Sequence, residues 1–462
     1  MTSMRISSGI RSRAITMAAA LAFTSFTAVA AGAETLADAL VSAYRNSNLL
    51  EQNRAVLRAA DEDVASAVAT LRPVVSFIAG VTRVSPAPAF GDSLSATVSL
   101  AAEVTLWDFG RSQIGIDIAK ETVLSTREAL VGVEQEVLLG AVVSFMNVKS
   151  ASQSVTINQN SVRVIGEELK AAEDRFAVGE VTRTDVALAQ ARLAAARATL
   201  AAAEGDLAAA REAYKAATGN YPGTLAAAPK PPALPKSVEE ARAIAQRSHP
   251  AVRQAQREVT VAELGVAAAE ANFGPTLTAN ARATLDDNGD DDYAVGLQLT
   301  QTLYTGGAKS AAHRRAIAFR DASRSALLQT GVTISEQVGN AWAQIGVSRA
   351  RIEATDRQIR AATVAYEGVR EEAKLGARTT LDVLDAEQDL LDAQADRIDA
   401  EASQQIAIYS LLASMGLLTV DHLNLGIPTY DPSIYYNAVR GAPATSVQGQ
   451  RLDRILKAIG KD

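Results

Sequence analysis

The sequence predicts a mainly α-helical chain that contributes four strands to a membrane β-barrel. One observation is a long internal repeat, because Gly179–Val186 resembles Gly376–Val383 at an offset of 197 residues. Another is that each repeat holds two segments in which apolar and polar residues alternate. The third is that the 69 residues after Gly110 contain no proline. A repeat this long indicates a duplicated unit, since solenoid repeats have periods of roughly 20–50 residues.

Residues 1–33 are predicted to be a signal peptide, so that Glu34 begins the mature chain. A basic start with three arginines precedes the apolar run Ala14–Val29, and the small residues Ala31-Gly32-Ala33 form the expected cleavage site. No other run of roughly 18 or more apolar residues occurs, so we expect no membrane-spanning helix.

Composition excludes several classes of function. The formal net charge is −7, and it becomes about −10 when the three arginines of the signal peptide are removed. Nucleic-acid-binding surfaces are usually basic, so we expect no nucleic-acid partner. The chain has no cysteine, which excludes thiol chemistry, cysteine metal sites and a lipid-anchored N-terminal cysteine.

The first repeat, residues 34–219, is predicted to run helix, β-hairpin, long helices. Residues 34–71 show helical spacing of apolar residues up to Pro73. The hairpin covers 73–107, with a turn over 85–91 that contains proline and glycine. The helix between Gly110 and Gly179 would span roughly 100 Å at 1.5 Å per residue. A return helix over 186–218 is rich in alanine and has leucines near the heptad spacing, which indicates close-packed supercoiled helices.

The second repeat, residues 238–416, has the same plan, with its hairpin at 275–304. The turn of that hairpin is predicted over 286–292. A stiff proline-rich linker, residues 220–237, joins the repeats. A tail, residues 417–462, follows, and residues 451–459 have the pattern of a short amphipathic helix.

The alternating segments favour a barrel over a soluble β-sandwich. A sandwich would also alternate, but two hairpins in a long helical chain are too few, and their apolar faces have no second sheet to cover them. Each strand has about ten residues, which is enough to cross a membrane at the tilt of a barrel strand. Four strands cannot close a barrel, so several chains must share one.

This order of elements resembles the outer-membrane efflux family typified by TolC, over roughly Glu34 to Met415. The most specific string is Gly376–Ala386, which is similar to a Gly-x-Arg-Thr-x-x-Asp-Val-Leu-Asp-Ala string in the family's second repeat. Thr218–Tyr221, at the end of the first repeat, is also similar to the family.

The resemblance implies a homotrimer in the outer membrane. Each chain would give four strands to a twelve-stranded barrel, and the long antiparallel coiled coil would form a tunnel through the periplasm that closes at its far end. A periplasmic adaptor protein and an inner-membrane transporter of the RND or ABC class would dock there. The function implied is a passive exit duct of a tripartite efflux system, with a role in multidrug resistance, or of a type I secretion system.

By the same resemblance, the two helix turns of the repeats are the periplasmic tips and the adaptor-docking sites. Gly179 and Gly376 follow helix ends, where a left-handed backbone favours glycine. Thr182 with Asp185, and Thr379 with Asp382, have the spacing of capping boxes.

Two charged residues of the second repeat have an apolar residue at the matching position of the first, and capping explains neither. Arg378 corresponds to Val181, and Asp385 corresponds to Leu188. Asp382 and Asp385 lie three residues apart on one helix face, so a trimer would bring six carboxylates together, which raise each other's pKa and attract cations.

By the resemblance, Asp382 and Asp385 form a selectivity ring, and Arg378 locks the gate with Thr184 and Asp185. Some relatives have a tyrosine in the lock where this chain has Ala373, so we expect a looser closed state. The alternative for Arg378 is a solvated surface charge, and for Asp185 and Asp382 it is capping alone.

The sequence supports no catalytic site, metal site or cofactor. The three histidines, His249, His313 and His422, are scattered without metal-ligand spacing. Trp107 and Tyr304 end strands at matching positions and fit either an interfacial aromatic girdle or a packed strand–helix junction. Two rival interpretations are a periplasmic adaptor, which would carry further β domains around one helical hairpin, and a structural coiled-coil protein of the envelope.

Overall fold

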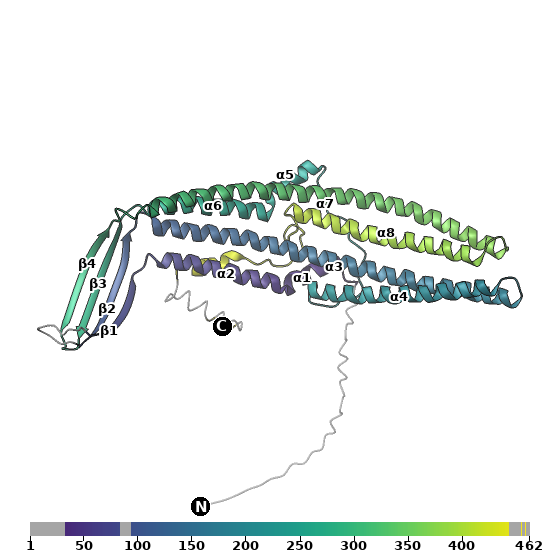
Figure 1. Ribbon diagram of the computed structural model, residues 1–462, viewed down its shortest axis with the longest axis horizontal. Helices are drawn as coiled ribbons and strands as arrows, with labels where there is room; N and C mark the ends of the chain where they lie inside the picture. Colours follow the sequence, from purple (N-terminus) through teal and green to yellow (C-terminus); the bar gives the residue numbers. More distant parts are fainter. Residues whose placement is uncertain (1–32, 84–93, 443–453, 455–457, 459–462) are drawn as a thin grey trace, which may run out of the picture.

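The computed structural model describes residues 33–83 and 94–442, with positions 454 and 458. The signal peptide up to residue 32, the turn 85–91 and almost all of the expected helix 451–459 lie outside the described residues. The molecule is elongated (Figure 1), with a four-stranded sheet at one end and the turns of two long helical hairpins at the other.

Each half of the chain begins with two short helices instead of the single helix expected over 34–71. These are α1 (Leu36–Asn46) and α2 (Asn48–Ala69), and then α5 (Val238–Ser248) and α6 (Pro250–Ala271). The expectation of one helix was wrong because Ser47 is extended and its side chain accepts a hydrogen bond from the Leu50 amide. His249, at the corresponding break, accepts from the Ala251 amide through Nδ1 at 3.1 Å. Capping by a polar side chain therefore starts a new helix at both places.

The strands form one antiparallel sheet in the order β1-β2-β3-β4. The strands are β1 (Val74–Arg83), β2 (Leu94–Trp107), β3 (Thr276–Asp286) and β4 (Asp291–Thr300). Pairing of β2 with β3, in which Ala102 lies opposite Ala281, joins the hairpins of the two repeats. β1 and β4 are left as the two edges of the sheet.

One face of the sheet is apolar and exposed. Phe77 lies opposite Leu100, and Ala279 lies opposite Leu297, so the register puts the apolar residues of all four strands on the same face. Phe77 is 72% exposed and Leu297 is 70% exposed. An uncovered apolar face of this size indicates contact with lipid or with another chain.

Two long helical hairpins leave the sheet. One is α3 (Arg111–Ala177) with α4 (Arg183–Thr218), and the other is α7 (Ala308–Lys374) with α8 (Thr380–Ser414). α3 and α7 have 67 residues each, and at 1.5 Å per residue each extends for about 100 Å. The two hairpins lie side by side, and their tips point away from the sheet (Figure 1).

The main core lies in the middle of the bundle, where all the layers of helices meet. Fully buried Phe145 of α3, Tyr214 of α4 and Leu411 of α8 belong to it. A smaller apolar cluster of Ile165, Ala189 and Leu384 lies closer to the tips.

The apolar composition of α3 is at odds with the expectation that the chain has no helix able to span a membrane. α3 is the one helix of the described residues with an 18-residue window apolar enough to cross a bilayer. Its central apolar residues, among them Leu138, Val142 and Phe145, are packed in the main core. Packing in this core accounts for part of the apolar window, of which 39% is buried, and a single helix of this kind is weak support for a membrane span.

The tail docks on the first helices through α9 (Pro432–Val439), which the sequence did not predict. The Tyr430 amide donates to the Tyr44 hydroxyl at 3.1 Å. The guanidinium carbon of Arg127 lies 5.1 Å from the ring centroid of Tyr436. The segment 417–442 therefore covers α2 and α3 beside the main core.

Candidate functional site at the hairpin tips

The two tips have the same backbone geometry. The left-handed residues are Gly179, at φ 83°, and Gly376, at φ 77°. The Glu180 amide donates to the Arg175 carbonyl at 2.9 Å, and the Ala377 amide donates to the Glu372 carbonyl at 2.9 Å. Both helices thus end in the hydrogen-bond pattern of a Schellman motif, which confirms the expected conformation of both glycines.

Both predicted capping boxes are confirmed. The Thr182 amide donates to Asp185 Oδ2 at 2.8 Å, and the Thr379 amide donates to Asp382 Oδ2 at 2.9 Å. Each threonine hydroxyl accepts from the backbone amide of its aspartate. Hydrogen bonds from these threonines lower the pKa of both aspartates, so both are ionised at neutral pH.

Arg378 is paired within its own hairpin. Its Nε lies 2.8 Å from Oε2 of Glu372, and both side chains are about half exposed. This hydrogen bond raises the pKa of the arginine. The chain does not bring Arg378 to Asp185, which lies on the other hairpin in its own capping box, and Thr184 beside it is exposed.

Asp385 joins the two hairpins. Its Oδ1 lies 2.6 Å from a terminal nitrogen of Arg192 on α4. Asp382, one turn earlier on α8, is held by Thr379 instead. The two carboxylates predicted to form one ring therefore have different partners in the chain. Ala373 is buried at the end of α7 and offers no polar group.

The sequence analysis missed a buried acid next to these residues. Glu387 of α8 is only 5% exposed. It continues the buried stripe of Thr380, Val383 and Leu384, at the spacing of an apolar helix face. An acidic residue inside such a stripe is the signal that could have identified it.

The far end of the molecule contains the strand–helix junction. The rings of Trp107 and Phe109 meet edge to face with centroids 5.8 Å apart, and Trp107 is 48% exposed. Tyr304 is 87% exposed and lies beyond the end of β4. Trp107 and Tyr304 therefore pack differently, although they occupy matching positions in the two repeats. No cluster of potential metal ligands occurs among the described residues.

Comparison with known proteins agrees with this architecture. The model of the family described as outer membrane efflux protein matches residues 39–220 and 242–417. The chain is 34% identical to the outer membrane efflux protein BepC of Brucella suis, over 92% of this chain and 95% of that protein. It is 26% identical to the outer membrane protein TolC of Vibrio cholerae, over 77% of this chain and 84% of that protein.

The fold is that of a solved channel. A crystal structure of CusC superposes with a TM-score of 0.74 at 18% identity and covers 83% of this chain and 92% of that one. The predicted fold class is confirmed: a long antiparallel coiled coil with four strands per chain for a shared membrane barrel.

Proposed function

The chain belongs to the outer membrane efflux protein family, whose members are channels and not enzymes, and on that premise we propose that it is the passive exit duct of a tripartite efflux or type I secretion system. Three copies close a twelve-stranded barrel in the outer membrane. Their hairpins extend through the periplasm to a gated end, where a periplasmic adaptor and an inner-membrane RND or ABC transporter dock. The transporter supplies the energy.

The observation that carries this proposal is the separation between the sheet and the tips. The sheet has two unpaired edges and an exposed apolar face, and unpaired edges in a membrane must be closed by neighbouring strands. The tips lie at the opposite end of the molecule (Figure 1). The proposed docking residues are Gly179, Thr182, Gly376 and Thr379.

The proposed gate consists of Asp382, Asp385, Arg378, Thr184 and Asp185. Asp382 and Asp385 are the selectivity ring, and proximity of six such carboxylates would attract cations. Arg378 is the lock. This role requires that Arg378 leaves Glu372 of its own hairpin and pairs with Thr184 and Asp185 of a neighbouring copy.

Single-channel recording in planar bilayers tests this function. We expect the native trimer to form a small, cation-selective pore that multivalent cations block. The double variant Asp382→Ala/Asp385→Ala should keep the pore and lose both the selectivity and the block. A well-folded trimer that forms no pore would contradict the duct itself.

A matched control separates charge from helix capping. Asp185→Asn and Asp382→Asn each remove the N3 carboxylate of a capping box, which weakens the start of the local helix to a similar extent at both tips. Only Asp382→Asn should reduce the cation selectivity. Equal loss in both variants would assign the effect to fraying of the tips.

A further inference from the structure

The hairpins meet near the tips around a carboxylate with incomplete hydrogen bonding. Glu387 is 5% exposed, and its Oε2 has no hydrogen-bond partner among the residues that the structure describes. Ser161 of α3 is buried on the side that faces the carboxylate, where it acts to lower the pKa of Glu387. A buried, incompletely paired carboxylate destabilises the packing around it when it is ionised.

The charges around Glu387 come from both hairpins. α3 faces it with Glu168 and Arg163, and α7 faces it with Arg370. Arg370 Nε lies 3.2 Å from Oε1 of Glu168 without the alignment of a hydrogen bond, so this arginine is shared by two acids. Tyr366 of α7 and Glu167 of α3 complete the titratable groups on this side.

The α4 side of the junction is apolar. Ala189 of α4 is fully buried and packs with Leu384, one turn before Glu387. The charged groups that act on Glu387 come from α3 and α7, and Arg192 of α4 is paired with Asp385. Thus α4 brings no free positive charge to the buried acid.

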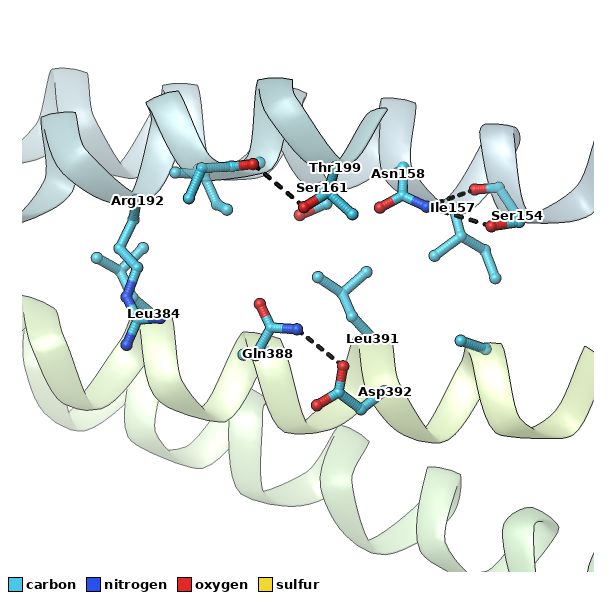
Figure 2. A pocket seen from close by; sticks show the side chains of 14 residues that line it. Ser154, Ile157, Asn158, Ser161, Arg192, Thr199, Leu384, Gln388, Leu391 and Asp392 are labelled. Atoms are coloured by element: carbon cyan, nitrogen blue, oxygen red, sulfur yellow. Dashed lines mark hydrogen bonds between the residues drawn. The ribbon is translucent and has the colours of Figure 1, made fainter. Parts of the chain in front are cut away.

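A cavity of about 270 Å³ lies beside this cluster, between α3, α4 and α8. Figure 2 shows Ser161 and Thr199 on one side of it and Gln388 and Leu391 on the other. A space of this size with polar walls has room for several water molecules. Glu387 does not line the cavity, but its neighbour Gln388 and Ser161 do, so water in the cavity would lie next to the buried acid.

We propose that Glu387 is a positioning residue of the closed tip: its protonated carboxyl packs α8 against α3, and its ionised form draws in water and releases the two hairpins from each other. The proposal rests on the proposed function, in which the tips close the duct. Glu387 lies five residues after Asp382, or about 7.5 Å along α8, so a shift at Glu387 moves the proposed selectivity ring.

The direction of the pH effect follows from the position of the acid. Burial and then the nearby Glu168 raise the pKa of Glu387 to about 7, against the opposing effect of Arg370. Because the pKa is raised in the packed state, protonation stabilises that state at acidic pH. This stability is lost as the pH rises through about 7. The duct should therefore open more readily at pH 8.5 than at pH 5.5.

Open probability across this pH range tests the proposal. In the native trimer we expect a rise of up to about tenfold, which corresponds to one pKa unit of differential stability. Glu387→Gln imitates the protonated acid and should stay closed at every pH. Glu387→Asp keeps a titrating group and should retain a pH-dependent rise. Identical profiles for Glu387→Gln and the native protein would overturn the proposal.

Asp61→Asn is the matched control. Asp61 of α2 is also fully buried, and neither of its oxygens has a hydrogen-bond partner among the described residues. Burial raises its pKa to about 6. It lies beside α9, far from the tips, so its replacement should leave the pH profile of opening unchanged. A flattened profile in Asp61→Asn would assign the pH effect to general stability.

A second readout does not require conduction. The chain has no cysteine, so Ala189→Cys places one thiol in the buried junction. The rate at which this thiol is labelled should rise with pH more steeply in Ala189→Cys than in Ala189→Cys/Glu387→Gln. Because the thiol itself titrates in both proteins, the ratio of the two labelling rates cancels that effect. A constant ratio overturns the proposal. A trimer that never conducts but shows the changing ratio would contradict the proposed function and leave Glu387 as the switch.

Discussion

At the scale of single residues, the tips combine a symmetric backbone with asymmetric charge. Both tips have a left-handed glycine and a threonine–aspartate capping box. Only the second has Arg378 and Asp385, which replace the Val181 and Leu188 of the first. The symmetric features shape both hairpins alike, whereas Arg378 and Asp385 distinguish the second tip from the first.

Arg378→Ser should increase the open fraction of the duct a few-fold, as expected when a half-exposed ion pair is lost in three copies. Glu372→Gln is the discriminating partner, because it frees Arg378 from its own hairpin. If the lock lies between copies, Glu372→Gln should leave the closed state intact or tighten it. Single-channel recording of both variants would reject the lock if they opened the duct equally.

Phe109 and Gly274 form a tight contact at the junction between sheet and helices. Phe109 has a positive φ of 59°, whereas Gly306 occupies the corresponding place in the second repeat at φ 61°. A left-handed phenylalanine costs roughly 1–2 kcal/mol. A Cβ on Gly274 would clash with the Phe109 ring, so the ring needs a glycine beneath it.

Gly274→Ala should therefore destabilise the trimer by about 1–3 kcal/mol through overpacking. Phe109→Gly removes the ring and the backbone strain, so the double variant should recover most of the loss. The temperature at which the trimer dissociates in SDS measures this. Additive effects of the two changes would show that the contact does not couple them.

At the scale of elements, the strands present two chemically different faces. Leu297 belongs to the apolar face, opposite Ala279, and its neighbour Gln298 belongs to the other face, opposite Thr278. In a barrel the apolar face with Leu297 contacts lipid, and the face with Gln298 lines the lumen.

Leu297→Arg should cost about 2–4 kcal/mol by placing a charge in lipid, whereas Gln298→Arg should be tolerated. The yield of SDS-resistant, heat-labile trimer extracted from the outer membrane measures both. Similar yields for the two variants would contradict the assignment of the faces.

The strands could be predicted because alternation along a strand fixes both its type and its faces. The capping boxes could be predicted because they are local. The break at Ser47 was missed, since a serine inside an apolar helical pattern gives no stronger signal than an ordinary surface residue. The docking of α9 depends on Tyr430 meeting Tyr44, a tertiary contact that local patterns do not contain.

The candidate site was predictable only in part, because the sequence shows which residues are unusual but not which residues they contact. Repeat comparison identified Arg378 and Asp385 without any structure. Their partners, Glu372 and Arg192, follow from how the helices pack, and spacing within one helix does not reveal a partner on another. Glu387 was marked in the sequence only as an acid within the apolar stripe of α8, and its burial follows from the packing of α8 against α3.

At the scale of the whole molecule, the chain separates its tasks by distance. The sheet and the tips lie at opposite ends of helices about 100 Å long. The main core and the docked tail lie between them and hold the hairpins together. A change at the tips can therefore alter gating without disturbing insertion of the barrel.

Cross-linking of the sheet edges tests the shared barrel most directly. The chain has no cysteine, so single cysteines along β1 can be paired with single cysteines along β4 without interference. We predict that matched positions form disulfides between copies in the outer membrane and yield a covalent product that stops at the trimer. Cross-linked dimers alone, an open ladder of larger products, or no cross-link between β1 and β4 at any position would contradict a closed twelve-stranded barrel.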